Sequence, residues 1–463
     1  MGNIIMSVTE KLASWAAETS DVRAADPLDK ARDAVLDTIG VMIAGAHDQA
    51  AKRVRRAVAN WGEGPATVVG QTTGLAAPWA ALANGTAAHA LDFDDSFGPV
   101  SGHASAVMVP ALLALGEQEG MSGHAILDAY VVGLEIQARV GQSVNVEHYK
   151  RGWHSTSTVS TIGTAAGCAR LLGLNVKGMQ NAISIAVSTA AGSKRQFGTM
   201  AKPMHAGLAA KNAVMAASLA SAGIEASDEP LDGKWGFRDL YAGEESPGFD
   251  AAMAALGDPL AIEEFCLSPK SYPCCASTHR SLDGLFALKA EHGINADDVD
   301  AITTVVPPIN FNNLMYSNPQ TEMERRFSMQ YCLSTAMTHG EVVLGDFRAG
   351  GETPDEVKSF MPKIDMQLSE HPDSSPQRPT LVEISLRDGR KLATEITHTK
   401  GQKEAPLSDQ DYARKFLGCA EEAMDAETAA SIHKDILTFD TLNSIAGVMA
   451  PLRNVHQAVA AAE

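Results

Sequence analysis

The sequence contains few aromatic residues and few positively charged ones. Phe, Trp and Tyr account for 5% of its 463 residues, and 37 Lys and Arg face 56 Asp and Glu, so the formal net charge is −19. Nucleic acids and anionic membranes attract proteins through basic patches, which an acidic chain of this kind lacks. We therefore expect no nucleic-acid partner and no charge-based attachment to a membrane.

Long hydrophobic runs and a regular cysteine framework are also missing. Charged residues, histidine or glycine interrupt every apolar stretch before the roughly 18 residues that a membrane-spanning helix needs. The six cysteines show neither the density nor the spacing of a secreted disulfide framework. The N-terminal segment has no basic stretch followed by an apolar run, so it is not typical of a signal peptide. These absences predict a cytoplasmic protein with reduced thiols.

Helical periodicity covers most of the chain. Apolar and small residues recur at helical spacing in segments such as 123–143 and 204–222, and the second of these consists largely of small residues. Small residues on a helix allow a neighbouring backbone to approach closely. The pattern predicts an all-helical domain made of residues 1–265 and 404–463.

The pattern changes between residues 266 and 403. Apolar and polar residues alternate over 382–386 and again over 392–396, and Asp388-Gly389 lies between these two runs. Asp-Gly suits the positive φ angles of a tight hairpin turn, so the segment predicts a β-hairpin. The sequence therefore predicts a mainly α protein, with a smaller α+β domain at residues 266–403 inserted into the large helical one.

Ionisable residues gather in four segments that a purely structural helical protein does not need. These segments are 84–105, 148–160, 192–207 and 268–284. The first contains the acidic sequence LDFDD, with Asp92, between His89 and His103. Carboxylates this close together raise one another's pKa or hold a histidine in its charged form. The alternative is a set of helix caps in a solvated loop.

The second and third segments combine histidine, hydroxyl groups and positive charge. His154 precedes a Ser/Thr run, which includes Thr156, where hydroxyl and backbone N–H groups at a helix start attract anions. Arg195 and Lys202 concentrate positive charge in an acidic chain, as an anionic substrate requires. A lysine beside a buried helix is also a candidate base. The alternatives are a capping cluster and a solvated basic loop.

The fourth segment places Lys270 close to Cys274, Cys275 and His279. Adjacent cysteines followed by histidine suggest zinc, but structural zinc sites use paired ligands two to four residues apart, and no second pair stands elsewhere. We therefore predict that the protein holds no metal. A phosphate-binding loop, a dinucleotide-binding glycine motif and a hydrolase nucleophile elbow are all missing, which disfavours nucleotide enzymes and ordinary serine hydrolases.

At these segments the sequence resembles the MmgE/PrpD family. The matching segments are NGTAAHALDFDDSF (84–97), HYKRGWHSTST (148–158), FGTMAKPMHAGLAAKN (197–212), KSYPCCASTH (270–279) and RRFSMQYCLSTAM (325–337). The resemblance implies a cofactor-free enzyme with a large all-helical domain and a smaller α+β lid domain, commonly a homodimer. Members include 2-methylcitrate dehydratase, cis-aconitate decarboxylase and iminodisuccinate epimerase.

The resemblance also implies which residues form the active site. The catalytic candidates are Asp92, His103, His154, Lys202 and Tyr149. The substrate-binding candidates are Thr156, Arg195, Lys270, His279 and Arg326, of which the arginines suit carboxylates. Two features depart from the dehydratase pattern, and the second of them is similar to epimerase-type members. Ala104 replaces the proline of the dehydratase pattern, and Tyr149 precedes the histidine.

The family's reactions all make or break a bond beside a carboxylate through an enolate-like state. We therefore expect a lyase or isomerase that acts on a small di- or tricarboxylate by acid–base chemistry. A dehydratase-type lyase is the first expectation, and an epimerase or a cis-aconitate-type decarboxylase is the alternative. The alternative outside enzymology is a helical scaffold or binding protein.

Overall fold

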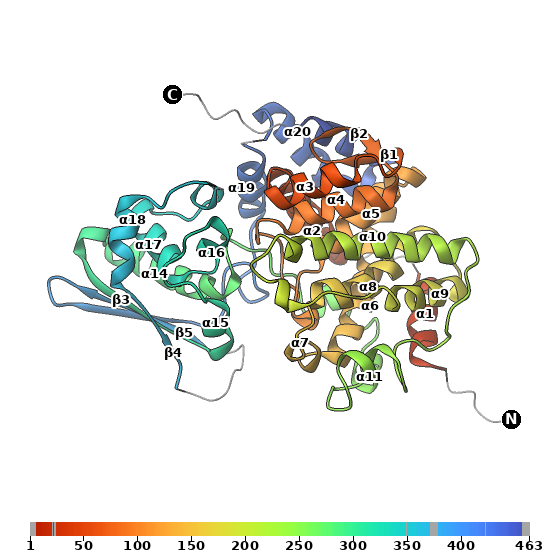
Figure 1. Ribbon diagram of the computed structural model, residues 1–463, viewed down its shortest axis with the longest axis horizontal. Helices are drawn as coiled ribbons and strands as arrows, with labels where there is room; N and C mark the ends of the chain where they lie inside the picture. The colour runs from red at the N-terminus through yellow and green to blue at the C-terminus, as the bar shows by residue number, and fades with distance from the viewer. Residues whose placement is uncertain are drawn as a thin grey trace. The chain divides into compact units, whose positions relative to one another are not determined.

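Helices form most of the structure, a computed structural model that describes residues 6–20, 22, 25–348, 350–370, 378–421 and 423–455 (Figure 1). The chain divides into two units. Unit 1 combines the residues up to Pro269 with those from Ser408 onward, and unit 2 spans Lys270–Leu407. The last eight residues of the predicted C-terminal helical segment, 456–463, lie outside the described residues.

Unit 1 is built mainly from helices. Its N-terminal part contains α1 (Val8–Glu18), α2 (Ala25–Gly45), α3 (Gln49–Val58), α4 (Ala77–His89), α5 (Ser105–Glu119), α6 (Gly123–Val144), α7 (Glu147–Lys150), α8 (Ser155–Leu171), α9 (Val176–Val187) and α10 (Ala201–Ser221). Three short helices and a C-terminal group follow, namely α11 (Phe237–Tyr241), α12 (Asp250–Ala254), α13 (Ala261–Glu264), α19 (Asp409–Ala420), α20 (Ala426–Leu437) and α21 (Ala446–Met449).

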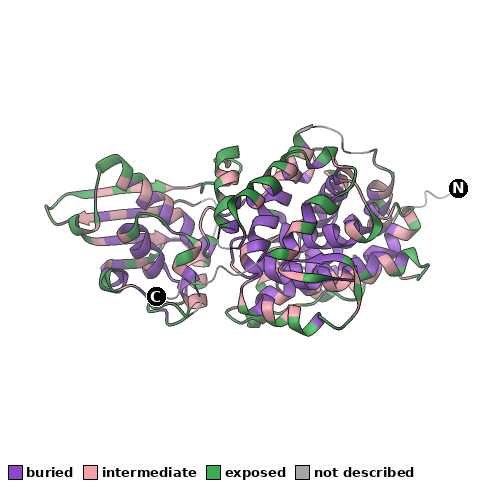
Figure 2. Cartoon of the chain, turned by 90° about the horizontal axis from the view of Figure 1, so that it is seen from above, coloured by how far each residue is buried: buried purple, intermediate pink, exposed green. Residues whose placement is uncertain are grey.

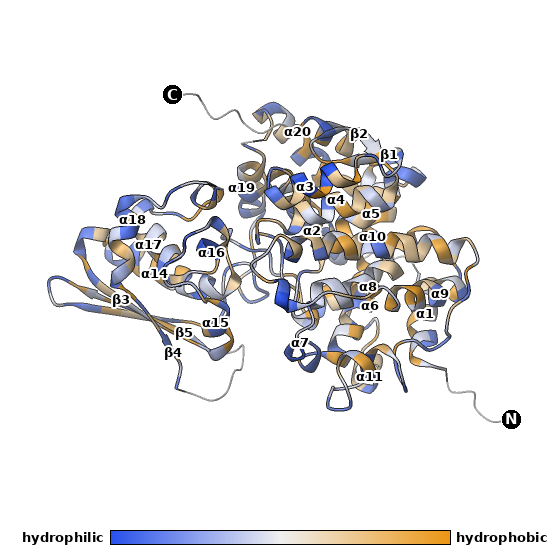
Figure 3. Cartoon of the chain, in the orientation of Figure 1, coloured by the Kyte–Doolittle hydropathy of each residue, from blue (hydrophilic) through white to orange (hydrophobic). Residues whose placement is uncertain are grey.

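The core of unit 1 lies around α4, α5, α8 and α10. Helix α8 packs against both α6 and α10 (Figure 1), and 16 of its 17 residues are buried. Figure 2 shows buried residues concentrated in the interior of the larger helical unit, and Figure 3 shows hydrophobic colour along α4 and α5. Because α4, α5 and α8 are buried on nearly every side, they lack the polar face of a surface helix.

Two glycines allow α4 and α10 to cross closely. A Cβ atom at Gly85 would lie 2.9 Å from the Cα atom of Gly207, and a Cβ atom at Gly207 would lie 2.2 Å from the carbonyl oxygen of Leu82. Either methyl group would therefore push the two backbones apart. The crossing fixes the end of α4, at His89, relative to the start of α10, close to Lys202.

The prediction that residues 1–265 are entirely helical is wrong at one place. An antiparallel hairpin forms from β1 (Glu63–Val68) and β2 (Gln71–Leu75). The β-branched sequence TVVGQTTG favours strands, and Gly70, with φ +74°, occupies the turn. Both strands are short and Pro65 precedes this run, so the alternation is too brief to stand out from the helical pattern around it.

Unit 2 contains a four-stranded sheet in the order β4-β3-β5-β6. Its elements are α14 (His279–His292), β3 (Val299–Val306), α15 (Pro308–Asn313), α16 (Glu322–Arg326), α17 (Met329–His339), α18 (Asp355–Phe360), β4 (Ile364–Leu368), β5 (Thr380–Leu386) and β6 (Lys391–Ile396). The predicted hairpin is confirmed, because β5 and β6 pair antiparallel and Gly389 has φ +91° in the turn. Helix α14 packs on β5 and β6, and α17 packs on β4.

Candidate active site

The loop between α4 and α5 carries the acidic sequence into the interior of unit 1. Asp92, Asp94 and Asp95 are 5%, 1% and 2% exposed. These carboxylates therefore do not lie in a solvated loop, which was the alternative interpretation of this segment. Burying charge without partners is costly, which means that each carboxylate needs a specific neighbour. We call residues 92–95 the acidic loop.

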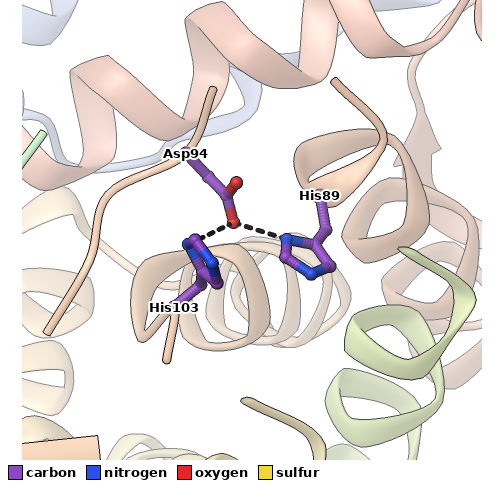
Figure 4. Close-up of side chains that lie close together, drawn as sticks. All are labelled: His89, Asp94 and His103. Atoms are coloured by element: carbon purple, nitrogen blue, oxygen red, sulfur yellow. Dashed lines mark hydrogen bonds and ion pairs between the residues drawn. The ribbon is translucent and has the colours of Figure 1, made fainter. Parts of the chain in front are cut away.

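Asp94 joins two histidines from either side of the acidic loop (Figure 4). One carboxylate oxygen, Oδ2, lies 2.7 Å from Nδ1 of His89 and 3.3 Å from Nδ1 of His103. The same His103 nitrogen lies 2.6 Å from the carbonyl oxygen of Asp95. A carbonyl oxygen can only accept, so His103 carries a proton on Nδ1. When the ring is neutral, its Nε2 therefore has the lone pair and is able to exchange a proton with a substrate.

Lys202 and Asp92 form a buried ion pair. The Lys202 ammonium lies 2.7 Å from Oδ1 of Asp92, and their side chains are 8% and 7% exposed. The amine also lies 5.5 Å from the centre of the Phe197 ring. The carboxylate and the face of the ring are both groups that attract an ammonium ion. Lys202 therefore suits the binding of a carboxylate or the stabilisation of negative charge that develops during a reaction.

His154 and His205 extend the site on the other side of His89. Their Nδ1 atoms lie 3.1 Å apart, so one ring donates and the other accepts. Burial lowers the pKa of His154 well below its ordinary value, and the neighbouring His89 and Lys202 lower it further. Burial also lowers the pKa of His205. Both rings are therefore neutral at neutral pH, and a neutral imidazole is a general base.

The four imidazoles form a continuous row, which we call the histidine cluster. The ring of His89 lies 4.7 Å from that of His103 and 5.6 Å from that of His154, and the ring of His154 lies 5.4 Å from that of His205. His103 and His154 were predicted as site residues from the sequence, whereas His89 and His205 were not. The signal was available, because both stand in the matching segments around 84–97 and 197–212.

Thr156 supports His103 from the start of α8. Its Oγ1 accepts a hydrogen bond of 3.1 Å from the backbone N–H of His103. A Cβ atom at Gly102 would lie 2.6 Å from the same oxygen, so only glycine fits beside it. The hydroxyl thus positions the backbone that carries His103, and the predicted role of Thr156 in substrate binding stays a prediction.

Asp95 is a buried carboxyl whose pKa burial raises to about 7. The backbone N–H and the hydroxyl of Ser105 both donate to it and partly oppose this rise. The Ser105 hydroxyl also lies 2.6 Å from the hydroxyl of Tyr130, so the carboxyl belongs to a fully buried network. Near neutral pH the Asp95 carboxyl is therefore divided between its protonated and charged forms.

The raised pKa of Asp95 makes folding stability depend on pH. Below an unfolded pKa near 3.8 its contribution is fully present, and stability falls as pH rises toward about 7, because the folded state resists ionisation. We expect Asp95→Asn to remove this loss. Urea denaturation at pH 5 and at pH 8 checks the result. The unfolding free energy is expected to fall between these two pH values by about 3 kcal/mol less in the variant than in the wild type. Equal falls in the two proteins would contradict the prediction.

Two predicted site residues of unit 1 take no part in the hydrogen bonds just described. Tyr149, on α7, is half-buried and its ring lies 3.4 Å from the ammonium of Lys194. Arg195 is exposed on the short helix Lys194–Gln196. The roles predicted for Tyr149 and Arg195 remain predictions.

Three further predicted residues belong to unit 2, where all are buried. His279 lies with Nε2 3.2 Å from the carbonyl oxygen of Cys274. Arg326 donates from Nη2 to the carbonyl oxygen of Phe347 at 3.3 Å, and its guanidinium lies 5.8 Å from that ring. Lys270 is 3% exposed. Their predicted roles in substrate binding remain predictions about unit 2.

One group of side chains in the described part of the chain has the composition of a metal site. A nitrogen of His89, an oxygen of Asp94 and a nitrogen of His103 lie within 4.8 Å of one another. Two histidines and a carboxylate are a known ligand set for divalent metals. Here the same atoms already satisfy one another, because Asp94 Oδ2 faces Nδ1 of both rings.

We therefore keep the prediction that the enzyme needs no metal. Elemental analysis of purified protein is expected to find zinc, iron and manganese well below one atom per chain. Activity is expected to survive a chelator. A stoichiometric metal whose removal abolishes turnover, and whose return restores it, would show that the three side chains are ligands.

A buried site with an ammonium, a neutral histidine and a carboxylate-bound histidine is typical of an enzyme that binds anions and moves protons. Two family models identify the class. The MmgE/PrpD N-terminal domain matches residues 10–250, and the MmgE/PrpD C-terminal domain matches residues 272–439. The chain belongs to the MmgE/PrpD family, and the resemblance predicted from the sequence is confirmed.

Curated relatives share about a quarter of the residues over most of the chain. A cis-aconitate decarboxylase from Mus musculus is 28% identical over 86% of this chain and 83% of its own length. One from Homo sapiens is 29% identical over 79% and 77%, and one from Aspergillus terreus is 24% identical over 96% of each. These relatives are enzymes, as this chain is. Among the described residues, no helix combines the length and hydrophobicity needed to cross a bilayer.

Proposed function

We propose that this enzyme is a lyase that acts on a small unsaturated tricarboxylate, with decarboxylation of a cis-aconitate-like acid as its leading reaction. One observation supports this proposal most strongly. The Lys202 ammonium, the Asp94–His103 pair and neutral His154 are buried together inside unit 1. The relatives named cis-aconitate decarboxylase support this reaction over the dehydration that the sequence analysis put first.

The residues of unit 1 suit the steps of such a decarboxylation. The bond to the leaving carboxylate breaks, its electron pair moves into the conjugated remainder of the substrate as an enolate, and carbon dioxide departs. The Lys202 ammonium stabilises the enolate oxygen electrostatically. His103, in its doubly protonated form beside the Asp94 carboxylate, then donates its Nε2 proton to carbon and is left as the neutral ring with its proton on Nδ1. The product is an unsaturated dicarboxylate.

Neutral His154 favours a second candidate, dehydration or epimerisation. Both reactions begin when a base removes a proton from the carbon beside a carboxylate. His154 suits that role because its lowered pKa leaves it uncharged at neutral pH. The three reactions thus share one enolate and differ in which bond breaks first.

One experiment separates the three reactions. Purified enzyme is incubated in D₂O with cis-aconitate, with 2-methylcitrate and with iminodisuccinate, and the mixtures are followed by NMR. A decarboxylase releases labelled carbon dioxide from carboxyl-labelled cis-aconitate and places one deuterium in the product. A dehydratase converts the hydroxy acid to an alkene without gas, and an epimerase exchanges the α-proton. Absence of all three changes would overturn the proposal and favour a binding protein.

A further inference from the structure

Helix α19 reaches the acidic loop through one buried lysine. The ammonium of Lys415 donates to the carbonyl oxygen of Phe93 at 2.8 Å and lies 4.1 Å from the centre of the Phe93 ring. The two residues are 322 positions apart in the sequence. The Lys415 side chain is only 6% exposed, so the contact is shielded from water.

A carboxylate on α2 holds the same lysine from the other side. Asp37 Oδ1 lies 2.7 Å from the Lys415 ammonium, and the Asp37 side chain is 3% exposed. Burial raises the pKa of Asp37, and the charge of Lys415 opposes that rise. The lysine is thus fixed between α2 and the backbone of the acidic loop, and α19 and α2 pack directly against each other.

The anchored carbonyl lies between the two carboxylates of the candidate site. Asp92, on one side of Phe93, holds Lys202, and Asp94, on the other side, holds His89 and His103. Asp92 has φ +54°, a conformation that aspartate tolerates but that open loops rarely keep without support. A displacement of the Phe93 peptide would therefore move both carboxylates together.

We infer that Lys415 is a positioning residue, which fixes the acidic loop through the Phe93 carbonyl so that Asp92 and Asp94 keep Lys202 and His103 in their reactive places. The inference rests on the proposed function, because it assigns Lys415 to the same site. Lys415 touches no reacting group. It acts through the backbone of residues 92–95.

Asp37 complicates a simple deletion of Lys415. Lys415→Met leaves the Asp37 carboxylate buried without the Lys415 charge, and breaking a buried ion pair in this way strongly destabilises a fold. The informative variant is therefore the double change Lys415→Met with Asp37→Asn, which removes both charges. Asp37→Asn alone is the matched control, because it keeps the bond from Lys415 to Phe93. Arg414→Met, at the neighbouring and 77% exposed position, is the surface control.

The double variant is expected to fold and to lose at least about 10-fold in kcat, with KM changed less than about threefold, since small misplacements of reactive groups act mainly on turnover. Asp37→Asn and Arg414→Met are expected to stay within about threefold of wild type. A variant with Lys415→Arg in place of Lys415→Met still has a donor for the Phe93 carbonyl, and it is expected to keep most of the wild-type activity. A folded double variant with wild-type kcat would overturn the inference and leave Lys415 as the neutralising partner of Asp37.

A second readout does not depend on the reaction. In protein carrying ¹⁵N-labelled histidine, the Nδ1 protons of His89 and His103 report the contacts with Asp94 and Asp95 by NMR. The double variant is expected to shift or broaden these signals, and Asp37→Asn is expected to leave them in place. If the wild type turns over none of the acids tested, the proposed function fails while these signals still decide the role of Lys415. Unchanged signals in the double variant would overturn it.

Discussion

Lys202→Met lowers turnover by at least about 100-fold while the protein still folds, and this is one of the two largest effects that we expect from a single change. The variant keeps the apolar stem beside Phe197 but removes the ammonium that pairs with Asp92 at 2.7 Å. Without that charge, neither a substrate carboxylate nor a developing enolate has its cation. Initial rates of the reaction identified by NMR, with circular dichroism on the same sample, measure the effect.

The control for Lys202 stands on the same helix. Lys211, half-buried near Trp79, belongs to α10 but lies two turns farther along it. Lys211→Met is expected to keep turnover within about threefold. Because Lys202→Met leaves Asp92 buried without its partner, a variant with Asp92→Asn in addition tests the same point if the single variant unfolds. Turnover near the wild-type rate in a folded Lys202 variant would reduce this residue to a structural ion pair.

His103→Gln is the second change with a large expected effect. Glutamine still donates a hydrogen bond toward the Asp95 carbonyl, but it cannot transfer a proton at neutral pH. We expect kcat to fall by about 100-fold or more and the incorporation of solvent deuterium into product to fall in parallel. Because the His103 side chain is only 15% exposed, circular dichroism on the same sample checks that the variant is folded.

A histidine far from any proposed chemistry serves as the comparison. His292, exposed at the end of α14 in unit 2, is replaced by glutamine in the control variant, which is expected to behave as wild type. If His103→Gln keeps the wild-type rate and the wild-type deuterium incorporation, His154 replaces His103 as the candidate residue that transfers the proton to carbon. The same measurement on His154→Gln then tests whether His154 transfers the proton.

Local patterns were sufficient to predict several parts of the fold. The small-residue segment at 204–222 is the main part of α10, and its glycine at position 207 is where α4 crosses. The Asp388-Gly389 pair is the turn between β5 and β6. Each of these features depends on residues that are close in sequence, so periodicity and turn chemistry indicate them.

The contacts inside the candidate site were not predictable in the same way. The sequence places Asp94 near His89 and His103, but only the path of the loop brings one oxygen to both rings. The β1–β2 hairpin was not predicted, because apolar and polar residues alternate over only a few positions in each of its short strands. Lys415 gave no signal at all, since its contact with Phe93 depends on helices far apart in the chain.

The order in which a ribosome makes this chain gives the Lys415 contact a further consequence. Asp92, His103, His154 and Lys202 are all synthesised in the first half of the protein, whereas Lys415 follows only after the whole of unit 2. A growing chain that ends before α19 has the acidic loop but no cation against the Phe93 carbonyl. We therefore expect chains that terminate before α19 to turn over substrate at least about 10-fold more slowly than chains that include Lys415.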